Sequence, residues 1–125
     1  MNIIINDHRK IYAVQKAFSQ MFPSLKLDFF TKSNTSGGAS SKKHLVGPSK
    51  TIGQCRTIHT KGTLSIVPHM TVSDLEQSFS DTFGLTVQLF HKSENGWLEI
   101  ATNMITLEEQ NTTASKPSLM GIDKQ

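Results

Sequence analysis

The chain has 125 residues, of which 36% are hydrophobic and 18% are charged, with a formal net charge of +3 at pH 7. This length suits one domain, and a chain of this size can bury a core without a disulfide or metal ion to stabilise it. A single cysteine, Cys55, excludes an internal disulfide and favours a reducing compartment. No apolar run approaches the length of a membrane span or of the apolar region of a signal peptide. We therefore expect a cytoplasmic protein with no membrane contact.

The first part of the chain predicts a strand, a helix and a second strand. Residues 3–5 are a β-branched run typical of a strand. Apolar residues then follow at intervals of three or four over 11–22, which places them on one face of a helix. Apolar and polar side chains alternate from Leu25 to Phe29, as they do in strands with one buried face.

A connector over residues 33–62 separates this unit from the next. Its first half is rich in Ser and Gly and predicts a long loop. Pro48 and the apolar residues Ile52, Cys55 and Ile58, spaced three apart, predict a short helix that ends near Gly62.

The second unit repeats the pattern of the first. Residues 63–67 predict a strand, and residues 71–83 predict a helix with Thr71 as its N-cap and Gly84 after its end. Residues 85–92 and 97–102 predict a hairpin. The spacing of Thr106 and Glu109 predicts a last helical turn, and residues 112–125 predict a flexible tail after a domain over 1–111.

An internal repeat relates residues 3–33 to residues 64–93. Ile3 matches Leu64, 61 residues later, and the apolar positions of the two predicted helices match at the same distance. We interpret this as a duplication of one strand–helix–strand unit. The repeat predicts an α+β fold with one mostly antiparallel sheet and both helices on one of its faces. A ferredoxin-like arrangement is the first interpretation, and a small sheet with the helices otherwise disposed is the alternative.

Four segments of residues 50–111 carry a resemblance: "KTIGQCRTIHTKGTLSI", "TVSDLEQSFSDTFGLTVQLFHKS", "WLEIAT" and "TLEEQN". Together they resemble a group of small uncharacterised bacterial proteins. The resemblance implies a small α+β protein that stands alone, and it implies no activity and no site residues.

Charge is distributed in two opposed blocks. The interval between Asp28 and Asp74 contains no acidic residue, whereas the charged residues of the segment 74–111 are acidic except for Lys92. The connector contributes a basic set that can attract phosphates, nucleic acid or an acidic protein surface: Lys42, Lys43, Lys50 and Arg56. A solvated loop whose lysines only aid solubility is the competing interpretation.

Three residues near the strand ends predict a second surface. Phe30 and Phe90 have the strand parity opposite to that of the apolar core positions, so we expect them, with Lys92, on an outer face. Aromatic side chains on a sheet can stack on the bases of RNA, but the motif typical of RNA-recognition domains is absent. An outer apolar pair also favours self-association, through sheet extension at an edge strand in particular.

No catalytic or metal-binding pattern emerges from the sequence. Cys55 and His59 form a single close pair, whereas zinc sites commonly use two such pairs, so we expect neither a metal nor a cofactor. The favoured hypothesis is a non-enzymatic binding or assembly module that forms a homodimer or larger homo-oligomer. Binding of single-stranded RNA or DNA through the connector is the alternative. An enzyme with a site that cannot be read from the sequence is the third, and Cys55, His59 and His69 are an example of residues that could gather in space.

Overall fold

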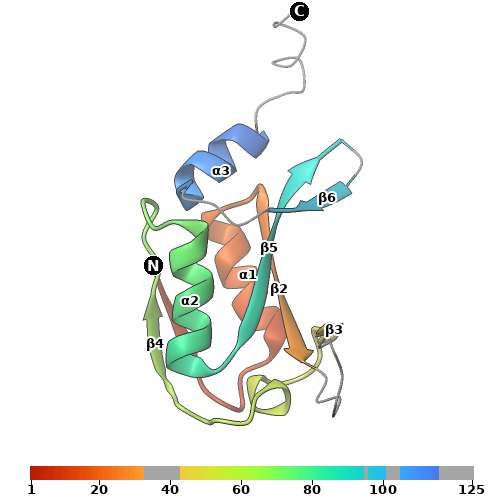
Figure 1. Cartoon of the computed structure of the whole chain (residues 1–125), viewed down its shortest axis with the longest axis vertical. Helices are drawn as coiled ribbons and strands as arrows, with labels where there is room; N and C mark the ends of the chain where they lie inside the picture. Colours follow the sequence, from red (N-terminus) through yellow and green to blue (C-terminus); the bar gives the residue numbers. More distant parts are fainter. Residues whose placement is uncertain (33–42, 95, 101–104, 116–125) are drawn as a thin grey trace, which may run out of the picture.

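The computed structural model describes residues 1–32, 43–94, 96–100 and 105–115 (Figure 1). Within these ranges, no helix is both long and apolar enough to cross a membrane. The elements in chain order are β1 (Asn2–Ile5), α1 (Ile11–Met21), β2 (Leu25–Lys32), β3 (Lys43–Leu45), the 3-10 helix η1 (Ile52–Cys55), β4 (Gly62–Ser65), α2 (Val72–Phe83), β5 (Thr86–Ser93), β6 (Gly96–Glu99) and α3 (Leu107–Ser115). The structure is α+β with antiparallel strand pairs, as the sequence predicts.

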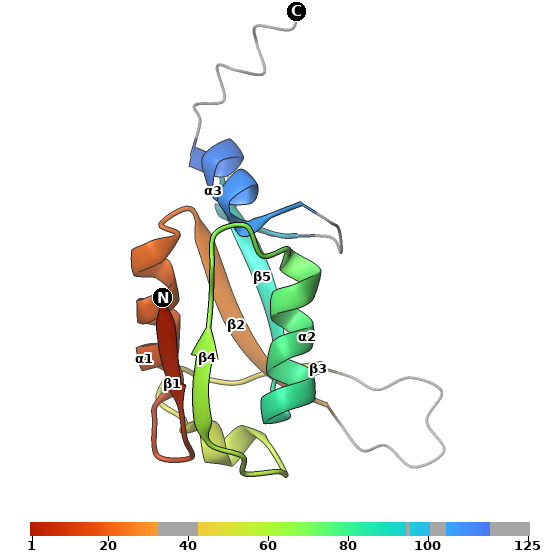
Figure 2. The ribbon, with the colours of Figure 1, turned by 90° about the vertical axis from the view of Figure 1, so that its left-hand side faces the viewer.

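The strands form two separate sheets. β1 pairs with β4 in a two-stranded ribbon, and the four-stranded sheet has the order β3-β2-β5-β6. The prediction of one sheet in a ferredoxin-like arrangement is therefore wrong for the described strands. The physical reason is that the first strand of each unit finds its partner in the other unit's first strand, on the far side of the core from β2 and β5. Figure 2 shows β1 and β4 in front, with β2 and β5 behind them.

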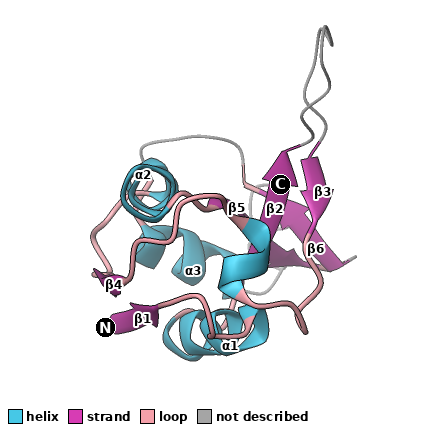
Figure 3. Cartoon of the chain, turned by 90° about the horizontal axis from the view of Figure 1, so that it is seen from below, coloured by secondary structure: helices cyan, strands magenta, loops and turns pink. Residues whose placement is uncertain are grey.

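Both predicted helices are confirmed, and each covers one flank of the core. Ile11, Val14 and Phe18 of α1 are buried, as their spacing requires. The hydroxyl of Thr71 accepts a hydrogen bond from the backbone N–H of Asp74 and caps α2. α2 ends at Gly84, whose φ of 65° lies in the left-handed region that glycine adopts without strain. Viewed from below, α1 and α2 lie on opposite sides of the space between the two sheets (Figure 3).

The connector is more ordered than a loop. β3 pairs with the end of β2, and Ile52 of η1 is buried in the core. The predicted helix over 48–62 is shorter than expected, because Arg56 already has extended backbone angles after Cys55. Residues 33–42, the Ser- and Gly-rich part of the predicted loop, lie outside the described residues.

The end of the second unit also differs from the prediction. α3 extends the predicted helical turn to Ser115, so the expected tail over 112–125 begins inside a helix. The N-terminal capping box is formed, since the Glu109 carboxylate accepts hydrogen bonds from the Thr106 backbone N–H and hydroxyl. Residues 116–125 lie outside the described residues.

The strand registers are symmetrical between the two units. In the ribbon, the Asn2–Ser65 and Ile4–Thr63 pairs lie on either side of the Ile3–Leu64 pair. The repeat matches Asn2 with Thr63 and Ile4 with Ser65, 61 positions later. Replacing each residue by its match therefore turns the Asn2–Ser65 pair into the Ile4–Thr63 pair. The β2–β5 ladder has the same symmetry about its Asp28–Gln88 pair, with matching residues 60 positions apart.

The symmetry extends beyond the repeat found in the sequence. The N–H of Val46 donates to the carbonyl of Phe29, and the N–H of Ile100 donates to that of Leu89. The N–H groups of Ile52 and Leu107, which open η1 and α3, donate in the same way to the loops before α1 and α2: to Arg9 and Met70. Each unit is thus a strand, helix, hairpin and terminal helical segment.

Phe79 tests this description of the core. It is fully buried in α2, and its ring meets that of Phe29 edge-on with the centroids 5.7 Å apart. We expect Phe79→Ala to lower the free energy of unfolding by about 3–5 kcal/mol, because it removes buried apolar area and leaves a cavity. Tyr12→Ala, at an exposed position of α1, should change it by less than about 0.5 kcal/mol. Urea unfolding measures both, and equal effects of the two substitutions would contradict the assigned core.

Candidate functional site

The outward-facing side of the four-stranded sheet is the candidate site. On β2, Leu25, Leu27 and Phe29 are buried, so the residues between them point away from the core. Directly opposite residues of an antiparallel pair share one face, which extends the assignment to the neighbouring strands. We call the following residues the outer face: Lys26, Asp28, Phe30, Leu45, Thr86, Gln88, Phe90, Lys92, Trp97 and Glu99.

The outer face carries an apolar cluster at each end. Phe30 lies opposite Leu45 of β3, and Leu45 is 64% exposed. Phe90 lies beside β6, where Trp97 is 41% exposed. α1, α2 and the ribbon lie on the other side of the sheet (Figures 2 and 3), and the side chains that border the outer face come from Gln15 of α1, beside Asp28, and from residues 54–57, beside Phe30. An aromatic surface of this kind on a small domain is typical of a contact surface.

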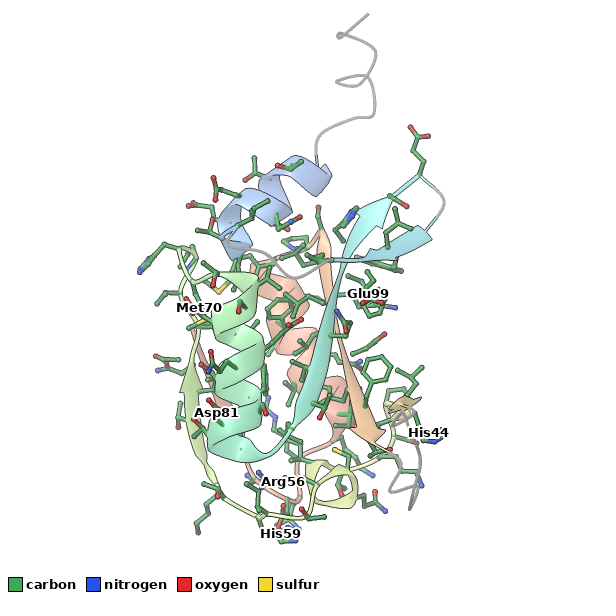
Figure 4. All side chains as sticks on the ribbon, viewed as in Figure 1. His44, Arg56, His59, Met70, Asp81 and Glu99 are labelled. Carbon is green, nitrogen blue, oxygen red and sulfur yellow. The ribbon has the colours of Figure 1, made fainter. Side chains whose placement is uncertain are left out.

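Charged side chains of both signs lie between these clusters. The Lys26 ammonium is 3.4 Å from the Asp28 carboxylate. It is also 5.1 Å from the centroid of the Phe90 ring and 5.6 Å from that of Trp97, within the range of cation–π attraction. Glu99 lies directly opposite Phe90 (Figure 4), and Lys92 lies directly opposite Trp97. The outer face is therefore mixed in charge, and it is not a basic patch.

Arg56 was expected to contact phosphates, and this prediction is wrong. Its side chain is fully buried, and its guanidinium donates to the Asp7 carboxylate at 2.9 and 3.1 Å. Nη1 of Arg56 also donates a hydrogen bond of 2.9 Å to the carbonyl of Phe83, at the end of α2. Burial removes Arg56 from any external ligand, and its role is to join the first unit to the α2–β5 turn.

Asp7 is the centre of this cluster. The ring nitrogen Nδ1 of His59 lies 2.7 Å from its second carboxylate oxygen. The hydrogen bond with His59 and those from Arg56 lower the pKa of Asp7 below its ordinary value of 3.8. The cluster holds the segment between η1 and β4 against the loop after β1, at the lower end of the molecule in Figure 4.

Cys55, His59 and His69, the example of a possible enzyme site, do not all gather in one place. Met70, the neighbour of His69 in the chain, lies at the opposite end of α2 from His59 (Figure 4). Cys55 is buried, its thiol donates to the carbonyl of Ile52, and burial raises the pKa of this thiol. Among the described residues, no group of three or more His, Cys, Asp or Glu side chains could hold a metal ion.

Of the remaining basic residues predicted in the connector, the structure describes the side chain of Lys50. Lys50 is exposed and borders a cavity of about 420 Å³ with Thr31, Leu45 and Gln54. Lys42 lies outside the described residues, and of Lys43 only the backbone, in β3, is described.

A neighbouring cavity of about 380 Å³ shows no catalytic arrangement. Its described lining contains hydroxyl, amide and apolar groups but neither a carboxylate nor a histidine: Phe30, Thr31, Gln54, Cys55, Arg56, Thr57, Gly84 and Thr86. The guanidinium of Arg56 is already engaged by Asp7 and Phe83. This part of the chain therefore offers no acid–base pair for a substrate in the cavity.

Comparison with family models, with curated proteins and with solved structures gives no match. The site is therefore argued from the geometry of this chain alone.

The structure brings three of the predicted residues onto one surface and adds others. Phe30, Phe90 and Lys92 lie on the outer face, as their strand parity indicates. Lys26 and Asp28 have the same parity as Phe30 and could have been found from the sequence by the same reasoning. Trp97 could be placed only once the register of the β5–β6 hairpin was known.

The Asp7 cluster predicts a specific response to acid. Because the pKa of Asp7 is lowered in the folded protein, its contribution to stability is fully present above pH 3.8 and is lost as pH falls through the lowered value. We expect Asp7→Asn to destabilise the protein at neutral pH and to do so less as pH falls below about 4. Urea unfolding at a series of pH values measures this. Asp81→Asn, at an exposed position of α2, is the control, and a pH-independent effect of Asp7→Asn would contradict the assignment.

Proposed function

We propose that the protein is a non-enzymatic binding and assembly module that associates with a second copy of itself through the outer face. The observation that supports the proposal is the pair of apolar clusters on one sheet face, in which Leu45 is 64% and Trp97 41% exposed. Their burial against a partner would remove apolar area from water, which is the main driving force for association.

The charges of the outer face support a second copy as the partner. A two-fold interface places the same surface on both sides, so the surface must be complementary to itself. Lys26 and Lys92 together with Asp28 and Glu99 supply both signs, which satisfies this requirement. The same carboxylates would repel the phosphates of a nucleic acid.

The edge strands support contact through the face in preference to sheet extension. β3 and β6, the edges of the four-stranded sheet, have 3 and 4 residues, and β1 and β4, the edges of the ribbon, have 4 residues each. Short edge strands present few unpaired backbone groups and are a common means of preventing strand addition. The edge-strand mode of association that the sequence favoured is therefore the weaker of the two.

We further infer that the two units arose by duplication. The symmetrical registers of both ladders, the matched hydrogen bonds of Val46 and Ile100, and the capped segments at η1 and α3 all support this. The repeat would then include each unit's hairpin and terminal helical segment.

Self-association is tested by the joint substitution of Phe30 and Phe90 with serine. We expect the wild-type protein to sediment as a dimer or larger oligomer and the double variant to sediment as a monomer, because the variant loses the phenylalanine ring of each apolar cluster. Tyr12→Ser, which removes an exposed aromatic ring from α1, should leave the assembly unchanged. Sedimentation velocity over a range of protein concentrations measures this. A wild-type protein that remains monomeric at high concentration and low salt would sink the proposal.

Nucleic-acid binding by the connector makes a different prediction. With Arg56 buried, contact with about three phosphates would give a slope of log affinity against log salt of roughly −2 to −3 for single strands. Joint substitution of Lys42 and Lys43 with alanine should then flatten the slope by between one and two. Fluorescence anisotropy of labelled single-stranded RNA and DNA at several salt concentrations measures this. Absence of binding at low salt would eliminate this alternative and leave the assembly module.

A further inference from the structure

The ammonium of Lys26 lies in a site built from three other side chains. It is 3.4 Å from the Asp28 carboxylate, 5.1 Å from the centroid of Phe90 and 5.6 Å from that of Trp97. Two aromatic rings and a carboxylate around one cation form the arrangement by which proteins recognise organic ammonium groups. In this structure the chain's own lysine occupies it.

The site does not depend on Lys26 for its shape. The Asp28 carboxylate accepts a hydrogen bond of 3.1 Å from the Gln15 side-chain amide, which also donates to the carbonyl of Leu27. The backbone of Phe90 is held in β5, and that of Trp97 is held by the β5–β6 pairing. The carboxylate and the backbone positions of both aromatic residues therefore do not depend on the lysine.

Lys26 is able to leave. Its side chain is 35% exposed, whereas that of Asp28 is 14% exposed. The lysine stem is flexible, and its ammonium is readily solvated. The Trp97 ring is accessible to a partner, since this residue is 41% exposed.

We propose that Asp28, Phe90 and Trp97 form a binding site for an alkylammonium group, the side chain of lysine or of N-methylated lysine, presented by a partner protein. Lys26 is an internal occupant that the incoming cation displaces. The proposal rests on the proposed use of the outer face for binding. At this end of the face the lysine-bearing partner competes with the second copy, so the probes are titrated at a protein concentration at which sedimentation shows the monomer. An anion is excluded because the carboxylate and the negative faces of the rings repel it.

The chain provides its own reporter, since Trp97 is its only tryptophan. The probes are Nα-acetyl-lysine methylamide and its Nε-trimethyl form, titrated at constant ionic strength while the fluorescence of Trp97 is recorded. We expect Lys26→Ala to bind the probes about tenfold more tightly than wild type, because a tethered competitor has been removed. Adding Asp28→Asn to Lys26→Ala should weaken binding about tenfold.

Lys92→Ala is the matched control. It removes one positive charge from the same face, opposite Trp97, without emptying the site. If Lys26→Ala binds the probes more tightly than wild type and Lys92→Ala does not, the result supports a site that the Lys26 ammonium occupies in the wild-type protein. Equal effects of the two, or no gain for Lys26→Ala, overturn the proposal. Circular dichroism checks the fold, and Lys26→Ser provides a second vacated variant if Lys26→Ala is unfolded.

The two proposals fail separately. A protein that sediments as a monomer but whose Lys26→Ala variant gains affinity for the probes loses self-association and keeps the ammonium site. A protein that dimerises through the aromatic clusters, but in which Lys26→Ala binds the probes no better than wild type, loses only the ammonium site.

Discussion

Strand pairing between the two units is the constraint on which the rest of the structure depends. Among the described strands, β1 pairs with β4 alone, and β2 and β5 form the centre of the larger sheet. A single unit would leave the backbone groups of its first strand unpaired and part of the apolar face of its helix exposed to water. Both cost free energy. Neither unit is therefore a complete domain, and the chain folds around the seam between them.

The same constraint determines which surface remains for binding. The ribbon and both helices are used to enclose the inner side of β2 and β5, where Leu27, Phe29 and Leu89 are fully buried. Strand alternation then forces Lys26, Phe30 and Phe90 to the other side. In the described part of the chain, no further helix or strand packs over them. The outer face that the fold leaves open therefore includes the rings of Phe30 and Phe90.

Local features of the sequence predicted the local structure and failed on the pairing of distant segments. The spacing of Val14 and Phe18 was sufficient for α1, because helical periodicity depends only on near neighbours. The existence of two sheets was not readable, because strand partners are chosen by contacts between residues about 60 positions apart. Arg56 was misassigned for the same reason: its charge is visible in the sequence, but Asp7, which pairs with it, lies 49 residues earlier. The outer face was partly predictable, since parity alone places Phe30 and Phe90.

The two ends of the outer face show how a symmetrical scaffold supports an asymmetric site. Phe30 and Phe90 occupy matching positions, but Lys26 corresponds to Thr86, and Glu99 corresponds to Leu45 of β3. Both ends therefore retain a ring, whereas, among the side chains that the structure describes, the basic and acidic partners lie around Phe90. A symmetrical apolar pair is sufficient for contact with a second copy. The charged groups at one end add a requirement for a cation, so the two ends are not interchangeable to a partner.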